Sequence, residues 1–275
     1  AQLINVSGID QASWQHQSNN HPMTIPRDGV LPKMLDRALQ ISKDYDVIIN
    51  LSYDWLPLWI TPHLEVKIFH LISMGGVSKL MKDVINNLSK SHHKRLAFHS
   101  NSQASDYFLK SEPIVLGNGF DLKDYQFQLG TEGPLGWAGR VAPEKGLEDA
   151  VEVAASIGET ILVWGIIEDS NYASNIEASF PAGTIDWRGF LDTQDFQKQL
   201  GICRAFINTP KWNEAYGNVV MEAMACGVPV VAYDRGGPGE LIKSGHTGWL
   251  VPPDDVEQLK VAVSKIDQID RNDCR

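Results

Sequence analysis

The sequence predicts an α/β protein built on parallel sheets that helices cover on both faces. Short apolar runs alternate with helical patterns along most of the chain, and the alternation is most regular after residue 134. Strands that alternate with helices of this length form βαβ units, which make a mostly parallel, doubly wound sheet. The length of 275 residues suits one large or two medium domains. We therefore expect two such domains, residues 1–120 and 134–275, joined by a linker at 121–133.

The first domain carries few strands. Its predicted strands are 46–53, 66–72 and 94–100, and its predicted helices are 30–43 and 76–90. The segment 11–29, rich in Gln, Asn, His and Pro, is predicted to be a loop. A complete doubly wound domain carries about six strands, and the chain starts at Ala1 without a Met. We therefore expect this domain to be incomplete and the chain to be a fragment.

The second domain follows the same pattern with greater regularity. Buried strands are predicted from runs of apolar residues, and a helical pattern follows most of them. The predicted strands are 134–140, 159–165, 184–190, 203–209, 229–234 and 248–251. The predicted helices are 146–157, 170–179, 192–201, 217–226, 237–243 and 254–267.

Composition excludes some classes of function. A formal net charge of −10 argues against wrapping a nucleic acid, although a local pair of cations can still bind a small anion. No window offers the roughly 18 uninterrupted apolar residues of a membrane span, so membrane association is not expected. The cysteines, Cys203, Cys226 and Cys274, lack C-x-x-C spacing, and a reduced cytoplasmic setting is the default expectation.

Two cations stand in the first strand-to-helix loop of the second domain, "GRVAPEKG". Ligands of doubly wound sheets bind beyond the carboxyl ends of the strands, where this loop lies. Arg140 and Lys145 can both point at one anion there, beside the amides of the next helix. On this loop alone, two solvated surface cations are an equally good interpretation. Neither a P-loop nor a G-x-G-x-x-G that follows a strand occurs in the chain.

A glutamate lies inside the predicted helix 217–226, among small and apolar residues. A carboxylate so close to a buried surface needs a partner, and Glu222 can accept hydrogen bonds from a sugar diol such as that of ribose. Taken alone, the commoner alternative is that Glu222 faces solvent or pairs with a Lys or Arg. Gly217 and Asn218 stand near the start of this helix, where free amides suit phosphate or sugar oxygens.

A series of motifs in a fixed order gives the second domain a family resemblance. The Arg140–Lys145 pair, the E-x7-E pair Glu214 and Glu222, "GVPVVAYDRGGPGELI" and "GHTGWLVPPDD" resemble retaining family-4 glycosyltransferases. The resemblance covers residues 134–262, and residues 94–122 also fit it. It implies the GT-B architecture of two Rossmann-like domains. It also implies a metal-independent transfer from a nucleotide sugar that needs no cofactor.

The resemblance implies a role for each matching residue. Arg140 and Lys145 match the cations that stabilise the leaving diphosphate, Glu214 matches the contact to the transferred sugar, and Glu222 matches the contact to ribose. His70 matches a histidine of the N-terminal domain that reaches the sugar across the cleft. The backbone amides of Ala215, Tyr216, Gly217, Asn218 and Val219 lie near the sugar, and Arg188 and Phe190 lie beside the base. The resemblance implies no metal ligands.

Within that family the chain is most similar to cyanobacterial UDP-glucose:tetrahydrobiopterin glucosyltransferases. The implied donor is UDP-glucose, and the implied acceptor is a small molecule, a reduced pterin. Asp54 could accept from a pterin amino edge and Trp55 could stack on its ring. An equally good alternative is that Trp55 and Trp59 cover the edge of the sheet or the domain interface.

Two other functions stay open. A lipid or cell-envelope acceptor is an alternative, because the segment 76–95 has some Lys and Arg content. A non-catalytic UDP-sugar-binding fragment is the other.

Overall fold

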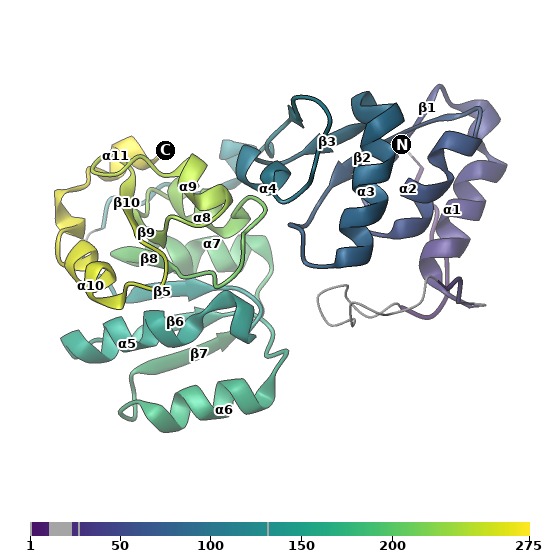
Figure 1. Ribbon diagram of the computed structural model, residues 1–275. Coiled ribbons are helices and arrows are strands. Elements are labelled where there is room, and N and C mark those ends of the chain that lie inside the picture. The colour runs from purple at the N-terminus through teal and green to yellow at the C-terminus, as the bar shows by residue number, and fades with distance from the viewer. Residues whose placement is uncertain (1, 11–23, 27, 131) are drawn as a thin grey trace. The chain divides into compact units, whose positions relative to one another are not determined.

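The computed structural model describes residues 2–10, 24–26, 28–130 and 132–275 (Figure 1). Most of the loop predicted at 11–29 lies outside the described residues. The chain divides into two compact units, Ala1–Gly117 and Asn118–Arg275. Each unit contains one parallel sheet, of four strands in the first and six in the second. Together with the helices these sheets make the two Rossmann-like domains of the GT-B architecture that the family resemblance implies.

The first unit confirms the three predicted strands and adds a short fourth, in the sheet order β1-β2-β3-β4. The helix at 55–60 was not predicted. The strands are β1 (Val47–Asn50), β2 (Lys67–Ile72), β3 (Leu96–Phe98) and β4 (Ile114–Val115). The helices are α1 (Val30–Gln40), α2 (Trp55–Ile60), α3 (Lys79–His92) and α4 (Asn101–Ser105), with 3₁₀ turns η2 (Ser42–Asp44), η3 (Thr61–His63) and η4 (His93–Arg95).

Helix α3 begins where its sequence provides a cap. The Ser78 hydroxyl accepts from the amide of Met81, which satisfies one of the orphan donors of the first turn. Met81, Ile85 and Leu88 then recur on one face of the helix and are fully buried. They pack in one apolar cluster with residues of β2 and β3, so α3 is anchored to the face of the sheet from which Ile72 projects.

The second unit confirms all six predicted strands, in the order β10-β9-β8-β5-β6-β7. Its parallel register is continuous except for an irregularity between β6 and β7. The strands are β5 (Leu135–Ala138), β6 (Ile161–Trp164), β7 (Ile185–Gly189), β8 (Ala205–Asn208), β9 (Val230–Tyr233) and β10 (Gly248–Val251). The helices are α5 (Leu147–Ile157), α6 (Ser170–Ser179), α7 (Thr193–Gly201), α8 (Asn218–Ala225), α9 (Gly237–Leu241), α10 (Val256–Ser264) and α11 (Arg271–Cys274), with η5 (Leu122–Asp124), η6 (Pro143–Lys145) and η7 (Ile266–Gln268).

Helices cover both faces of this sheet, as Figure 1 shows. Alternate residues of a strand point to opposite faces, so Trp137 joins the cluster under α5, α6 and α10, whereas Ala138 joins the cluster under α7 and α8. All four residues of each of β5, β6, β8 and β9 are buried. Burial on both sides explains why these strands read as continuous apolar runs.

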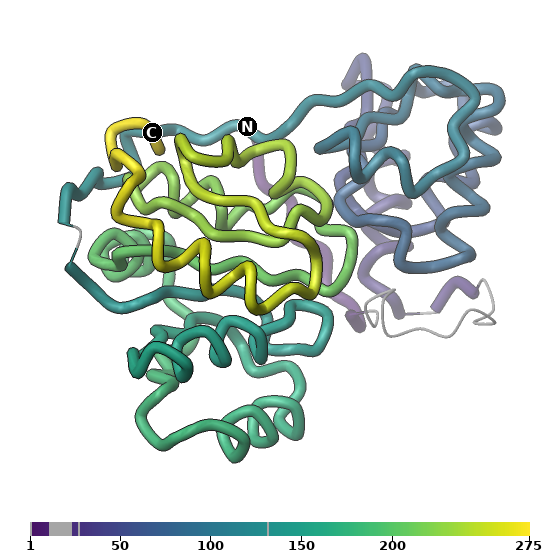
Figure 2. The backbone as a smooth tube through the Cα atoms, turned by 60° about the vertical axis from the view of Figure 1, so that its left-hand side comes forward, coloured from purple at the N-terminus to yellow at the C-terminus, as the bar shows by residue number. Residues whose placement is uncertain are grey.

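The second compact unit begins at Asn118, and described residues of the predicted linker 121–133 form hydrogen bonds with the rest of this unit. The amide of Gln126 donates to the Gln197 side chain at 2.6 Å, and the amide of Gln128 donates to the carbonyl of Cys226 at 3.1 Å. The buried Arg271 guanidinium donates to the carbonyls of Gln128, Gly201 and Cys203, each at 2.9 Å. The last helix is thereby joined to the segment that opens the unit (Figure 2).

Candidate functional site

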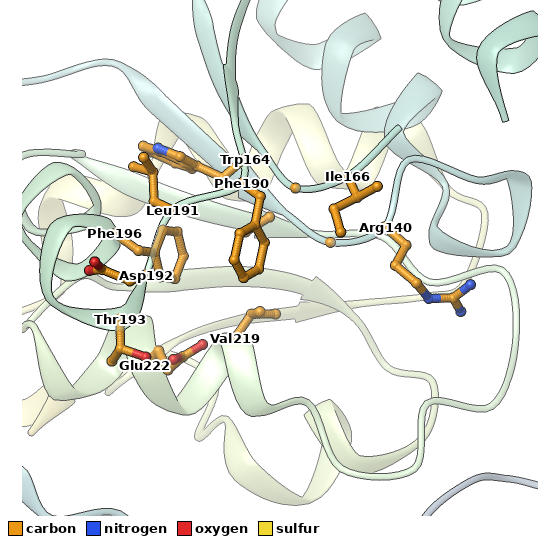
Figure 3. A pocket seen from close by; sticks show the side chains of 13 residues that line it. Arg140, Trp164, Ile166, Phe190, Leu191, Asp192, Thr193, Phe196, Val219 and Glu222 are labelled. Atoms are coloured by element: carbon orange, nitrogen blue, oxygen red, sulfur yellow. The ribbon is translucent and has the colours of Figure 1, made fainter. Parts of the chain in front are cut away.

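A pocket of about 490 Å³ opens at the carboxyl ends of β5 and β6 (Figure 3). The strand order reverses beside β5, because β6 and β7 continue on one side and β8 lies on the other. Ligands of doubly wound sheets bind at this reversal. The pocket is lined by Ala138, Gly139, Arg140, Trp164, Gly165, Ile166, Phe190, Leu191, Asp192, Thr193, Phe196, Val219 and Glu222.

One wall of the pocket is aromatic. Trp164 and Phe196 pack edge to face with ring centroids 5.4 Å apart, and the Trp164 indole donates to Gln199. Phe190 projects into the pocket from the loop after β7 and is 73 % exposed, so its ring is available to stack on a flat ligand. Arg188, also predicted beside the base, pairs with Asp186 at 2.5 Å and is not among the lining residues.

Glu222 faces the pocket from the second turn of α8. Its carboxylate accepts a hydrogen bond from the Tyr125 hydroxyl at 3.3 Å. Burial raises the pKa of Glu222, and the Tyr125 bond lowers it. Burial and the nearby carboxylate raise the pKa of Tyr125 to about 12, so the phenol stays a donor at neutral pH. Because Glu222 lines the pocket, a ligand there could use the remaining acceptor sites of its carboxylate.

Arg140 stands at a different end of the pocket from Glu222, as Figure 3 shows. It leaves β5 and forms ion pairs with Glu168 and with Glu144, the latter at 3.0 Å. Its side chain keeps 36 % of its surface exposed. The guanidinium is therefore ordered by carboxylates and still open to a ligand.

Lys145 and Glu214 meet although 69 residues separate them along the chain. The lysine ammonium donates to one carboxylate oxygen of Glu214 at 2.5 Å. Gly146 makes this contact possible, because its φ is +65° and a Cβ there would lie 2.0 Å from the carbonyl of Thr209. The loop after β5 thus comes directly against the loop after β8. The structure brings these two predicted residues together.

Trp212 is a residue of this cluster that the sequence reasoning missed. Its indole N–H donates to the Glu214 carboxylate at 3.0 Å. Its ring lies 4.8 Å from the Lys145 ammonium and 5.9 Å from the Arg140 guanidinium. The sequence signal for it was its place two residues before the first glutamate of the E-x7-E pair.

Lys211 is a second residue that the sequence analysis did not predict. Its hydrogen bonds link the loop after β8 to residues after β5 and after β10. Its amide donates to the carbonyl of Glu144 at 2.9 Å, and its ammonium donates to Asp149 and to Asp254. Burial lowers the pKa of Lys211, but the hydrogen bonds to these two carboxylates outweigh it, so the pKa is raised. Asp254 also pairs with Arg235, whose hydrogen bond lowers the pKa of Asp254. The loop before Glu214 is therefore held from three elements.

The segment from Ala215 to Val219 turns into α8. Gly217 has a φ of +99° and precedes the first helical residue, Asn218, whose side chain accepts from Asn118 at 2.5 Å. Tyr216 packs against the turn after β9, where a Cβ on Gly237 would lie 2.1 Å from the Tyr216 carbonyl. The first-turn amides of a helix have no carbonyl partner four residues back. The start of α8, four residues after Glu214 in the chain, could therefore supply amide donors to a ligand.

His70 of the first unit is fully buried and hydrogen-bonded at both ring nitrogens. Asn50 offers its amide N–H to Nδ1 at 3.0 Å, because its carbonyl oxygen already accepts from Ser52. Nε2 lies 2.8 Å from the hydroxyl of Thr61, which donates to the carbonyl of Pro57. The neutral tautomer with the proton on Nε2 satisfies all these groups. The contact of His70 with a sugar stays a prediction, and it requires one of these bonds to break.

Asp54 and Trp55, the predicted acceptor residues, lie at the start of α2. The Asp54 carboxylate is buried and caps the helix by accepting from the amide of Leu56 at 3.0 Å. Trp55 belongs to the apolar cluster of the first unit and contacts Trp59 edge to face, with centroids 6.3 Å apart. Both residues thus have structural roles, and their contact with an acceptor stays a prediction.

Within the described ranges, no group of three or more His, Cys, Asp or Glu residues could hold a metal ion. The Asp44-x-Asp46 sequence precedes β1 and therefore lies at the amino edge of its sheet, away from the edge where ligands bind. None of the helices that the structure describes is long and apolar enough to cross a bilayer.

Comparison with known families and proteins finds a glycosyltransferase family and glycosyltransferase relatives. The family model described as "Glycosyl transferases group 1" matches residues 131–274, more than half of the chain. An uncharacterized glycosyltransferase of Methanocaldococcus jannaschii is 26 % identical over 169 residues, which is 58 % of this chain and 45 % of that protein. A GDP-mannose-dependent alpha-mannosyltransferase of Mycobacterium tuberculosis is 32 % identical over 123 residues, or 45 % of this chain and 31 % of that protein. The chain thus spans less than half the length of these relatives.

Solved structures share the fold. HepE of Anabaena in complex with UDP-glucose superposes with a TM-score of 0.76 at 18 % identity, covering 89 % of this chain and 77 % of that one. Sucrose-phosphate synthase of Thermosynechococcus elongatus gives a TM-score of 0.74 at 20 % identity, covering 90 % and 70 %.

Proposed function

This chain belongs to the group 1 glycosyltransferases, and we propose that it transfers glucose from UDP-glucose to a small acceptor with retention of the anomeric configuration and without a metal. The observation that carries this proposal is the layout of one pocket, which Glu222, Phe190 and Arg140 line, with Glu222 and Arg140 at different ends. Lys145 is not among the lining residues, but it and Arg140 both contact the ring of Trp212. A uridine diphosphate has the same order of groups: a flat base, a diol and a charged diphosphate. The base would stack on Phe190, the ribose diol would bind Glu222, and the diphosphate would lie between the two cations.

The chemistry of the transfer fits these residues. When the bond between the anomeric carbon and the diphosphate breaks, negative charge grows on the leaving oxygen. Arg140, Lys145 and the amides at the start of α8 supply fixed positive charge for that oxygen. Glu214 lies against Lys145 and would accept from hydroxyls of the sugar that is transferred. The ion pairs that now neutralise both cations would be exchanged for the diphosphate.

The acceptor is proposed from the resemblance to pterin glucosyltransferases. Asp54 and Trp55 are its proposed ligands in the first unit, and His70 the proposed contact to the sugar from that unit. Each of these contacts needs a rearrangement, because Asp54 caps α2 and His70 is bonded at both nitrogens.

Calorimetry with UDP, UDP-glucose and GDP-mannose tests the donor. We expect binding of the two uridine ligands, and equal or tighter binding of GDP-mannose would refute the choice of base. Mass spectrometry after incubation with UDP-glucose and a panel of acceptors that includes tetrahydrobiopterin then tests the acceptor. NMR of the product's anomeric proton reports retention, and activity that survives EDTA supports metal independence.

A second candidate is a protein that binds a UDP-sugar without turning it over. It is kept as a candidate because the chain spans less than half the length of these relatives, and transfer requires an acceptor site in addition to a donor site. Tight UDP-glucose binding together with no transfer to any acceptor, lipid acceptors in liposomes included, would establish it.

A further inference from the structure

We propose that Trp212 is a positioning residue of the donor site, which holds the two cations over its ring and aims the Glu214 carboxylate with its indole N–H. This inference rests on the proposed function, because it gives these three charged side chains the donor as their ligand. Trp212 itself is assigned no contact with the donor.

Two donors converge on one oxygen of Glu214. The Lys145 ammonium reaches that oxygen at 2.5 Å, and the Trp212 indole N–H reaches it at 3.0 Å. The side chains of Lys145 and Glu214 are only 19 % and 16 % exposed, so water screens the contact little. Hydrogen bonds to a charged group in such a place are the strong ones. The orientation of the carboxylate is therefore set by the lysine and the indole together.

The ring of Trp212 meets both cations. The Lys145 ammonium is 4.8 Å from its centroid and the Arg140 guanidinium is 5.9 Å from it. Both distances lie within the range of about 6 Å at which an aromatic face attracts a cation. Two neighbouring cations repel each other, and a shared aromatic face offsets that repulsion without adding an anion that would compete with a diphosphate.

The backbone before Trp212 is fixed from outside the site. The amide of Lys211 donates to the carbonyl of Glu144, and its ammonium is tied to Asp149 and Asp254. The indole is thus carried by a loop that is held to the turn after β5, which bears Lys145. A rigid support is what a positioning residue requires.

Binding of the donor would separate the contribution of the indole N–H from that of the aromatic ring. A diphosphate draws Lys145 toward itself, and Glu214 then loses the lysine as its partner. The Trp212 N–H remains on the carboxylate and keeps it directed at the sugar. The N–H therefore matters most for ligands that carry a sugar, whereas the ring matters for every ligand that carries the diphosphate.

Calorimetry of the 275-residue chain with UDP and with UDP-glucose tests this separation. Trp212→Phe keeps an aromatic face and removes the N–H. We expect its UDP affinity to stay within about twofold of wild type, and its affinity for UDP-glucose relative to UDP to fall about tenfold, as loss of a hydrogen bond to a charged group implies. Trp212→Leu also removes the face, and we expect UDP affinity itself to fall by about three- to fivefold. Trp249→Phe, at an indole outside the pocket, is the matched control and is expected to change neither ratio.

The outcomes are distinct. A wild-type chain that binds neither UDP nor UDP-glucose overturns the proposed function and this inference with it. Binding by wild type with an unchanged affinity ratio in Trp212→Phe overturns the positioning role alone. A lowered melting temperature in Trp212→Phe, with both affinities reduced by the same factor, shows a merely structural role and overturns it too. Normal UDP affinity in folded Trp212→Leu refutes the part assigned to the ring.

Discussion

Because His70 is buried and its pKa is lowered, we expect the free energy of unfolding to fall in acid. Burial, and in second place the charge of Arg95, lowers the pKa of His70 to about 4, from 6.5 for an unperturbed imidazole. Protonation of Nδ1 would set an N–H against the Asn50 amide, which points its own N–H at that nitrogen. The folded protein therefore resists the proton that the unfolded chain accepts.

The sign and size of the effect follow from linkage. Between pH 6.5 and pH 4 the unfolded state binds a proton at this site and the folded state does not, so the free energy of unfolding falls as the pH falls through this window. Each pKa unit corresponds to about 1.4 kcal/mol. Going from pH 7 to pH 5 should therefore remove about 2 kcal/mol of stability through His70 alone. Above pH 7 this group contributes no pH dependence.

Urea denaturation of wild type and His70→Gln at pH 7 and pH 5 measures this difference. The variant lacks the titrating ring, so we expect its stability to fall by about 2 kcal/mol less than that of wild type over the same interval. An NMR titration of the ring proton gives the pKa directly. Equal pH dependence in both proteins, or a ring that titrates near 6.5, would refute the buried neutral state and would favour the contact of His70 with a ligand.

Three further perturbations test the site and the fold. Lys145→Ala should weaken UDP-glucose binding about ten- to a hundredfold, because a hydrogen bond to a charged group is lost; the exposed Lys198→Ala serves as its calorimetric control. Glu222→Gln should weaken UDP as well as UDP-glucose, and an effect on the sugar-bearing ligand alone would exchange the roles of the two glutamates. Gly165→Ala should fail to fold or melt at a much lower temperature, since its φ is +136° and the new Cβ would lie 1.8 Å from the Gly139 carbonyl. Gly158→Ala, with a φ of +70° and open space around it, should cost only about 1–2 kcal/mol.

The strands of the second unit could be predicted because burial on both faces leaves a plain signal. β9 is the run Val-Val-Ala-Tyr, every residue of which is buried, and flanking turn residues mark its ends. Helix α2 left no such signal. It is six residues long, begins with Trp-Leu-Pro-Leu and buries its first four residues, so it has no polar face from which a helical period can be read. β4, two residues long, is too short for any pattern.

The residues of the candidate site likewise fall into two groups, those that lie in a sequence motif and those that only the fold reveals. Arg140, Glu214 and Glu222 could be singled out because each lies in a recognisable motif in the loop or helix that follows a strand. The structure places Arg140 and Glu222 in the pocket lining, and the roles of all three stay predictions. Trp212 could not be singled out, because its contacts depend on the direction of the indole and on two loops that only the folded sheet brings together. His70 is the opposite case, because the sequence pointed to the residue but not to its surroundings. Its motif matched, but its burial and its two hydrogen-bond partners, Asn50 and Thr61, are properties of the fold.

The three hydrogen bonds from Arg271 to backbone carbonyls have a consequence for folding during synthesis. The residues it joins, Gln128, Gly201 and Cys203, emerge from the ribosome long before Arg271 does. Until then three carbonyls that the finished unit buries must stay hydrated or remain exposed to chaperones. We expect a nascent chain arrested before residue 271 to be sensitive to protease, and one arrested after the whole unit has left the exit tunnel to be resistant. The second unit therefore cannot complete these three contacts before Arg271 has left the exit tunnel, although its sheet is built from neighbouring βαβ units.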